Sequence, residues 1–431
     1  MKQIGNYRWT ICGLVFFATT VNYLDRNVIS YLKPYLAEAF QWTPEQEVND
    51  YANIELAFKL AYAVGMLYAG SFVDKMGSKL GYAIATGLWS IAAVAHAFAG
   101  GTSGFVIARI FLGVTEAGNF PAAIKAVAEW FPKKERALAT GIFNSGTNIG
   151  AIIVPLSVPL IAETWGWQWA FILTGVIGFV WLFLWFIYYE IPAKQARLSK
   201  AEFDYIHSDR EEPVTQEKVP WLKLLTFRQT WAFALGKFLT DPVWWFYLFW
   251  LPDFLMKEYH LSKTEIIWPS AMVYIIGSIG SIAGGWLPMN LINKGWATFK
   301  ARKTSMLIYA FLVLPVLFSQ YMGSINMWLA VLVIGIAASA HQAWSANIFT
   351  TVSDMFPKKA TGSVTGIGGM FGGLGGILLT WLVQKNMFVY YTKIGQIQTG
   401  YFIMFCICGA AYLTAWVVMH FLVPKMKPVE L

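Results

Sequence analysis

Long apolar runs separated by short polar links follow one another along the whole chain. A helix needs about 20 mainly apolar residues to cross a bilayer, and twelve runs reach this length. One longer polar stretch separates them into two groups of six. The pattern predicts an all-α protein with a six-helix bundle at 1–190, a cytoplasmic central loop at 191–228 and a second six-helix bundle at 229–431. The twelve predicted transmembrane helices lie near residues 9–31, 51–73, 80–100, 103–127, 137–161, 168–189, 229–256, 264–290, 304–321, 326–351, 361–384 and 399–423.

The composition excludes most other classes of protein. Of the 431 residues, 13% are charged and 57% are hydrophobic, whereas soluble proteins carry about 25% charged residues. So few charges exclude a soluble multidomain enzyme, a disordered scaffold and a secreted disulfide module. The three cysteines, Cys12, Cys406 and Cys408, lie in apolar runs without CxxC spacing or a nearby histidine. We expect buried thiols, no metal site and no cofactor.

Lysine and arginine residues predict the orientation in the membrane. With the N-terminus in the cytoplasm, 22 of the 32 cations lie on the cytoplasmic side and five on the opposite side. This asymmetry follows the positive-inside rule. It predicts a multi-pass protein of the inner (plasma) membrane with both termini cytoplasmic, and it explains the net charge of +8 without a nucleic-acid partner.

The two halves of the chain share a sequence repeat. The segment FPKKERALATGIFNSGTNIG at 131–150 aligns without gaps to FPKKATGSVTGIGGMFGGLG at 356–375. The same offset places Glu116 on His341. Two parallel repeats predict pseudo-symmetric bundles, with a binding site near the bilayer midplane between them.

The loop that follows the second predicted helix resembles a signature of the major facilitator superfamily. Residues 70–79, GSFVDKMGSK, are similar to its GxxxD(R/K)xGx(R/K) loop. The resemblance implies the twelve-helix major facilitator fold. It also implies that Asp74 and Lys75 form part of a latch on the cytoplasmic side, and the alternative is a well-capped short loop.

Further segments are similar to the anion:cation symporters of this superfamily, which import organic anions with protons. They are NYLDRN at 22–27, RIFLGVTEAGNFP at 109–121 and EWFPKKER at 129–136. AHQA at 340–343 and SDMF at 353–356, together with Phe143 and Asn144, resemble hexuronate transporters. Those carry glucuronate and galacturonate.

Several ionisable residues fall inside predicted transmembrane helices, and four of them lie on the first and fourth helices. A charge at the bilayer centre costs about 2.5–3.5 kcal/mol, so Asp25, Arg26, Arg109 and Glu116 must pair or line a wet cavity. Arg109 and Glu116 are seven residues apart and share a helix face with Gly113. We interpret Arg26 as the group that binds a substrate carboxylate, because its planar fork suits that geometry.

Asp25 and Glu116 are interpreted as proton-coupling carboxylates, with Arg109 as the partner of whichever is ionised. Burial opposes the ionisation of such groups and neighbouring arginines favour it. The family resemblance implies the same roles. The alternative is a permanent network of salt bridges between two helices.

Other polar side chains in apolar runs are candidates for sugar binding, since each can exchange hydrogen bonds with hydroxyl groups. For each of them the alternative is packing or hydrogen bonding between helices. The candidates are Tyr23, Tyr62, Asn144, Asn148, His341, Gln342 and Ser345.

Two i,i+4 pairs of opposite charge are the last candidate functional residues. Lys237 and Asp241 precede Pro242, and a lysine stands where the hexuronate pattern has an arginine. We interpret this pair as structural or as a gate. Glu55 and Lys59 have no counterpart in the family pattern, and we interpret them as an interfacial salt bridge or as an extra carboxylate contact that changes specificity.

These observations predict a monomeric, proton-coupled secondary transporter that imports a hexuronate by alternating access. Its partners are the anionic sugar acid, protons and the lipid bilayer. Alternatives of the same fold are a symporter of an aldonate such as galactonate, or of another carboxylate, and an organophosphate antiporter. A membrane sensor or a membrane-embedded enzyme is a different class, and no HExxH or GxSxG motif supports an enzyme.

Overall fold

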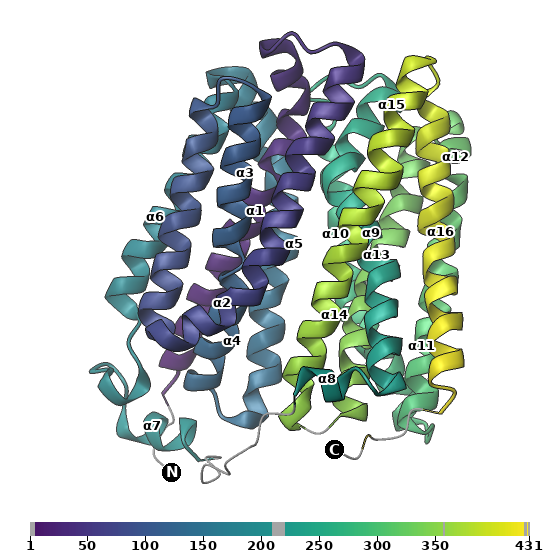
Figure 1. Ribbon diagram of the computed structural model, residues 1–431. Coiled ribbons are helices and arrows are strands. Elements are labelled where there is room, and N and C mark those ends of the chain that lie inside the picture. The colour runs from purple at the N-terminus through teal and green to yellow at the C-terminus, as the bar shows by residue number, and fades with distance from the viewer. Residues whose placement is uncertain (1–4, 209–219, 357, 426–428, 430–431) are drawn as a thin grey trace. The chain divides into compact units, whose positions relative to one another are not determined.

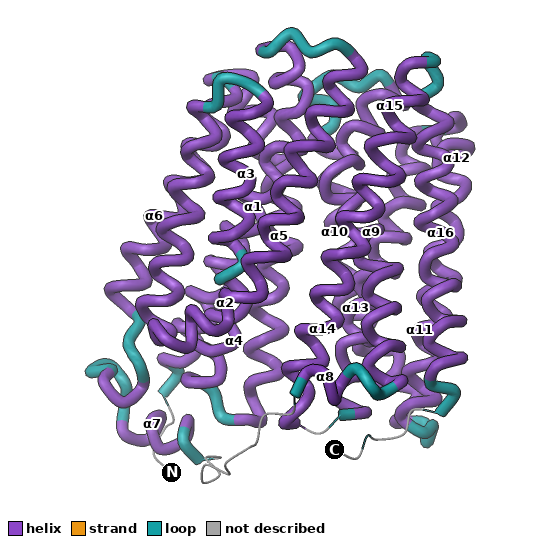
Figure 2. Tube along the Cα trace, in the orientation of Figure 1, coloured by secondary structure: helices purple, strands orange, loops and turns teal. Residues whose placement is uncertain are grey.

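The structure, a computed structural model, describes residues 5–208, 220–356, 358–425 and 429. These residues form helices joined by short loops, and none of them lies in a strand (Figures 1 and 2). The helices are α1 (Tyr7–Ala39), α2 (Pro44–Ala95), η1 (His96–Phe98), α3 (Thr102–Glu116), α4 (Asn119–Trp130), α5 (Lys133–Trp165), α6 (Trp167–Tyr188), η2 (Pro192–Lys194), α7 (Lys200–Ile206), α8 (Trp221–Leu224), α9 (Arg228–Tyr259), α10 (Ile267–Asn293), α11 (Thr298–Val313), η3 (Leu314–Phe318), α12 (Ser319–Ile325), α13 (Met327–Met355), α14 (Lys358–Leu378), η4 (Leu379–Lys385), α15 (Asn386–Lys393) and α16 (Ile397–Leu422).

Each of the twelve predicted transmembrane segments contains helix, and three of them, the fourth, the ninth and the eleventh, differ in continuity. The second and third segments are two helices that meet within α2 at Gly77, whose non-helical φ of 78° suits glycine. The fourth is divided into α3 and α4 by a turn at Ala117 and Gly118. The ninth contains a 3₁₀ segment, η3, and the eleventh contains the π-helical segment η4. These breaks are local changes of hydrogen-bond pattern and leave the all-α membrane fold unchanged.

Among the residues that the structure describes, eight helical segments are long and apolar enough to cross a membrane. The remaining long helical segments are α1, the first half of α2, α3 with α4, and α9, which contain most of the buried ionisable residues. Charged side chains are expensive where a helix faces lipid, so these helices must turn their charges towards protein or water. The polar helices are therefore the ones that can build a binding site.

The contacts within the chain divide it into two compact units. Unit 1 comprises Met1–Trp42 and Asn53–Val214, and unit 2 comprises Thr43–Ala52 and Thr215–Leu431. The first two turns of α2 thus pack with unit 2, and the rest of the helix belongs to unit 1.

The sequence repeat corresponds to a structural repeat. Phe131 ends α4 in an extended conformation (φ −124°, ψ 135°), and its repeat mate Phe356 ends α13 in the same way (φ −113°, ψ 142°). The next helices, α5 and α14, begin 225 residues apart, at Lys133 and Lys358. Gly150 of α5 lies against the backbone of α1, and its mate Gly375 of α14 lies against that of α9. Each unit thus uses the same glycine position to bring two helices close together.

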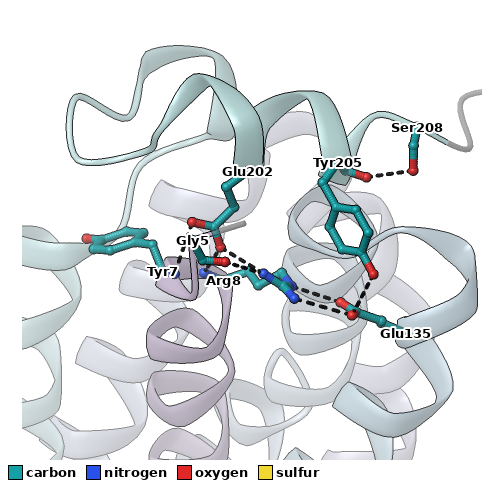
Figure 3. Close-up of polar contacts among 7 residues, drawn as sticks. All are labelled: Gly5, Tyr7, Arg8, Glu135, Glu202, Tyr205 and Ser208. Carbon is teal, nitrogen blue, oxygen red and sulfur yellow. Dashed lines mark hydrogen bonds and ion pairs between the residues drawn. The ribbon is translucent and has the colours of Figure 1, made fainter. Parts of the chain in front are cut away.

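Ion pairs around Arg8 hold the short helix α7 against the first turn of α1. Arg8 lies between two carboxylates, with Nε donating to Glu135 at 2.8 Å and Nη1 donating to Glu202 at 3.1 Å (Figure 3). Glu202 also accepts hydrogen bonds from the backbone N–H groups of Tyr7 and Arg8, and Tyr205 donates to Glu135. The two carboxylates together outweigh the effect of burial and raise the pKa of Arg8. Glu202 of α7 therefore caps the first turn of α1.

Candidate functional site

The guanidinium group of Arg26 lies among three aromatic rings of unit 1. Its Cζ lies 4.6 Å from the ring centroid of Tyr23, 4.7 Å from that of Tyr62 and 5.3 Å from that of Phe58. Arg26 itself is buried, whereas Tyr23 and Tyr62 are partly exposed. Aromatic faces at this range attract a cation. We call Tyr23, Phe58 and Tyr62 the aromatic cage. It surrounds the Arg26 guanidinium with one buried ring and two partly exposed ones.

An ion pair joins Arg26 to Glu116 at the last turn of α3. Arg26 Nε donates to Glu116 Oε2 at 2.9 Å, and Nη2 donates to Asn22 Oδ1 at 3.2 Å. The side chains of Arg26 and Glu116 are 4% and 0% exposed. Glu116 Oε1 is buried and accepts no hydrogen bond from the described residues. The arginine thus has a carboxylate partner that retains a free acceptor oxygen.

Asp25 is a second buried carboxylate beside this pair. It is 2% exposed, and the hydroxyl of Thr174 on α6 is a hydrogen-bonding group beside it. Glu116 and Arg109 lie near enough to act on it electrostatically. The structure therefore brings the two carboxylates and two arginines of the sequence prediction into one cluster in unit 1.

Arg109 is positioned by a close approach of α2 and α3. Its Nη1 donates to the backbone carbonyl of Arg26 at 3.1 Å, and its Cζ lies 5.4 Å from the ring centroid of Phe58. One turn further, a Cβ on Gly113 would lie 2.6 Å from the carbonyl oxygen of Phe58 and 3.0 Å from the nitrogen of Tyr62. Gly113 thus provides the space that brings the aromatic cage against the arginines.

The two candidate asparagines belong to α5. Asn144 is exposed and Asn148 is buried, one turn apart on α5. At 100° per residue they share the side of α5 opposite to Gly146 and Gly150, which pack against α1. The structure does not place them on the face of α5 that contacts the helix of Arg26.

In unit 2, His341 is buried in an aromatic environment. Its ring is parallel to that of Trp244, with centroids 5.2 Å apart, and its Nδ1 lies 2.6 Å from the hydroxyl of Tyr412. Gln342 and Ser345 nearby on α13 are partly exposed. His341 thus has a fixed orientation, and the flanking polar groups are the accessible ones.

Lys237 and Asp241 form their expected pair on α9, with Lys237 Nζ 2.7 Å from Asp241 Oδ2. Lys237 Nζ also lies 4.3 Å from the ring centroid of Phe349. The ammonium group therefore has both a counter-ion and an aromatic face.

The latch residues are only partly described. Lys75 is exposed, and the side chain of Asp74 lies outside the described part of the structure. Ser78 of the same loop donates a hydrogen bond to Glu129 of α4, which also accepts one from Tyr189. Lys79 Nζ lies 2.7 Å from Glu190, and this hydrogen bond lowers the pKa of that carboxyl.

Sequence reasoning missed several residues of the site. Asn22 and Phe58 touch Arg26, while Trp244 and Tyr412 surround His341. Asn22 lies four residues before Arg26, and this helical spacing is a signal that could have identified it. The others are aromatic residues among the many of an apolar chain, and no local pattern distinguishes them.

The comparisons with known proteins identify the superfamily. The family model described as Major Facilitator Superfamily matches residues 15–380. The chain is 34% identical over 389 residues to a hexuronate transporter of Escherichia coli (strain K12), covering 89% of this chain and 88% of the relative. It is 35% identical over 292 residues to a galacturonate transporter of Dickeya chrysanthemi, covering 67% and 84%.

Two further comparisons extend the picture. A D-galactonate transporter of Escherichia coli O6:H1 is 28% identical over 390 residues, covering 88% of this chain and 89% of the relative. Among solved structures, a D-xylose-proton symporter matches with a TM-score of 0.77 at 16% identity, covering 99% of this chain and 100% of the other. At that identity the likeness concerns the fold alone.

Proposed function

The chain belongs to the Major Facilitator Superfamily and is a membrane transporter rather than an enzyme, and from this we propose that it imports a sugar acid together with protons. The substrate class follows from relatives that carry hexuronates, galacturonate and galactonate. Among these we favour a hexuronate, glucuronate or galacturonate, because the hexuronate and galacturonate transporters are the more similar to this chain.

The observation that carries the proposal is the Arg26–Glu116 ion pair beside the aromatic cage. Only Nε of the guanidinium is engaged by Glu116 and only Nη2 by Asn22. A substrate carboxylate can replace Glu116 as the planar partner of Arg26, since arginine binds carboxylates through two parallel hydrogen bonds. Tyr23 and Tyr62, which are partly exposed, would then meet the hydroxyl groups of the sugar.

In this proposal, the replacement of Glu116 by a substrate carboxylate at Arg26 also couples substrate binding to proton uptake. When a substrate anion takes the place of Glu116 at Arg26, an ionised Glu116 would be left buried without its cation, which is unfavourable. Uptake of a proton by Glu116 removes that cost. Asp25, which is buried beside this pair, is the second carboxylate that can carry a proton. One proton per monoanion makes the cycle electroneutral, and a second proton would add the membrane potential as a driving force.

The transport cycle is proposed to be alternating access, in which the substrate site opens first to one side of the membrane and then to the other. Lys237 and Asp241, with the loop that contains Asp74 and Lys75, are the proposed gating groups. His341, Gln342 and Ser345 are the proposed contribution of unit 2 to sugar binding, and Asn144 and Asn148 that of α5.

Uptake of labelled galacturonate and glucuronate into proteoliposomes, with and without an inward proton gradient, tests this function. We expect gradient-stimulated uptake that excess galactonate inhibits weakly. Strong galactonate uptake without hexuronate uptake would move the substrate to the aldonates, an alternative that the galactonate relative supports. Uptake that is insensitive to the proton gradient would contradict proton coupling.

A further inference from the structure

The buried ion pairs of unit 1 differ in what they join. Glu55 pairs with Lys59 within α2, and both side chains are 1% exposed. The burial contradicts the interpretation of this pair as an interfacial salt bridge. Arg26 and Glu116 are almost as deeply buried, but they join α1 to α3. The proposed function requires the Arg26–Glu116 pair to separate in every transport cycle, so the groups that limit its strength bear on transport.

One edge of the Arg26 guanidinium is shared between two acceptors. Nε and Nη2 form this edge, and a single carboxylate can bind both nitrogens through two parallel hydrogen bonds. Glu116 uses only Nε, which donates to its Oε2 at 2.9 Å, while Nη2 donates to Asn22 Oδ1 at 3.2 Å. Glu116 Oε1 is buried and accepts no hydrogen bond from the described residues. The amide of Asn22 therefore engages the nitrogen that the second oxygen of Glu116 would otherwise reach.

Packing between helices does not explain the amide of Asn22, which is 0% exposed. A guanidinium only donates hydrogen bonds, so the amide oxygen must face Arg26 and Nδ2 must point elsewhere. Nδ2 is buried and has no acceptor among the described residues, which costs free energy. The bond from Arg26 to Asn22 stays within α1, between residues one turn apart, and cannot hold two helices together. The contact with Arg26 is therefore the effect that the amide has on its surroundings.

The charged groups that face Glu116 come from two helices. They are Arg26 and Asp25 of α1 and Arg109 of α3. α2 also packs on this end of α3, through Gly65, which adds no charge. Among the described residues, Glu116 accepts a hydrogen bond from Arg26, and each such bond favours the ionised carboxylate over the protonated one. A carboxylate held at both nitrogens would leave Arg26 less readily than one held at Nε.

We propose that Asn22 is a positioning residue whose amide limits Glu116 to one hydrogen bond with Arg26, which keeps the ion pair exchangeable and leaves Glu116 Oε1 free for the coupling proton. This inference rests on the proposed function and deepens it. The substrate carboxylate takes the place of Glu116 at Arg26, and the proton forms an O–H bond at Oε1 of Glu116. The negative charge of the substrate and the positive charge of the proton cancel, so the net charge of the cluster is unchanged.

Two substitutions of Asn22 with opposite expected effects test this role. Asn22→Leu keeps the branched shape but removes the acceptor, so that Glu116 can bind both nitrogens of the edge. Asn22→Asp keeps the size and places a second carboxylate at Nη2. The control is Asn27→Leu, because Asn27 lies on the same helix, is 2% exposed and has no hydrogen-bond partner for its amide among the described residues.

The full chain in proteoliposomes is measured once with substrate and once without. The first measurement is the initial rate of labelled galacturonate uptake as a function of external pH. The second is an infrared titration of the protonated carboxyl group of Glu116, whose band is identified by subtracting the spectrum of Glu116→Gln. A residue with a purely structural role would change the uptake rate or the melting temperature without moving either pH midpoint.

The two variants should move both pH midpoints in opposite directions. Asn22→Leu should lower them by about one pH unit, because a second hydrogen bond from Arg26 favours the ionised carboxylate. Asn22→Asp should raise them, because a neighbouring anion favours the neutral form of Glu116. Asn27→Leu should leave both midpoints where they are in the wild-type protein.

Unchanged midpoints in both Asn22 variants, or shifts in the same direction, would overturn the inference. If Asn22→Leu does not fold, Asn22→Asp decides alone, and a midpoint at or below that of the wild type overturns the inference. Failure of the proposed function is a separate outcome. If the wild-type protein takes up no galacturonate, that function fails, while opposite infrared shifts still support the role of Asn22. If uptake is proton-driven but the infrared midpoints do not move, the function stands and the inference is wrong.

Discussion

Arg26 makes contacts that a lysine at the same position could not make. Its planar group contacts three aromatic rings and donates through two different nitrogens, to Glu116 and to Asn22. An ammonium group is a compact point charge without the fork that binds a carboxylate through two bonds. The geometry around Arg26, more than its charge, is therefore what a substrate carboxylate would recognise.

The substitution Arg26→Lys tests this at the scale of one side chain. We expect the affinity for the transported acid to fall roughly tenfold or more, corresponding to at least 1.4 kcal/mol. Substrate binding is measured in purified protein. Arg197→Lys is a matched control, because Arg197 also lies over a tyrosine ring but is exposed outside the transmembrane helices. Unchanged affinity in Arg26→Lys would remove Arg26 from the site.

The two buried carboxylates lead to a second prediction. Asp25→Asn and Glu116→Gln should each abolish accumulation driven by a proton gradient, because an amide cannot bind and release the coupling proton. At least one variant should retain exchange of labelled for unlabelled substrate, which needs no net proton movement. Asp204→Asn, an exposed carboxylate of α7, is the control. Normal accumulation by both variants would show that coupling lies elsewhere.

At the scale of helices, the contact between α2 and α3 decides where the arginines lie. Gly113 lies between Arg109 and Glu116 on α3, and a side chain there would meet the backbone of Phe58 and Tyr62 on α2. Small residues allow transmembrane helices to approach closely. Here the close approach brings the aromatic cage to the ion pair.

Gly113→Ala should therefore impair binding although it touches no charged group. The added methyl would lie 2.6 Å from a carbonyl oxygen, and relief of such overpacking typically costs about 1–3 kcal/mol. We expect a lower melting temperature in detergent and a weaker affinity for the substrate. Gly141→Ala on α5 is the control, since a Cβ there has no neighbour within 4 Å. Equal behaviour of the two variants would contradict the role given to the helix contact.

The whole molecule is oriented, in our prediction, by its asymmetric distribution of lysine and arginine. A fluorescent protein fused to the C-terminus should fluoresce, and alkaline phosphatase at the same place should be inactive, because both termini are expected in the cytoplasm. The reverse should hold for fusions in the link at residues 99–101, on the opposite side. Active phosphatase at the C-terminus would show that the predicted orientation is wrong.

The described helices correspond to the twelve predicted segments because the bilayer imposes a simple requirement on sequence. A spanning helix needs a minimum apolar length, and that length is visible in the linear chain. The boundary between the second and third segments also has a local cause, the positive φ of Gly77, which separates the two helices of α2. The division between α3 and α4 has no comparable signal, since Ala117 and Gly118 also occur within continuous helices.

By itself, the sequence determined the helical segments, the repeat and the superfamily, because each depends on residues close together in the chain or on a short alignment. It also singled out Asp25, Arg26, Arg109 and Glu116, since charges stand out in apolar runs. Only the tertiary structure decided that Glu116 pairs with Arg26, 90 residues away, and that Phe58 lies against both arginines. It also decided that Glu55 and Lys59 are buried. Partners on different helices depend on how those helices pack, and the packing of an almost uniformly apolar chain is set by many weak contacts that no local pattern reveals.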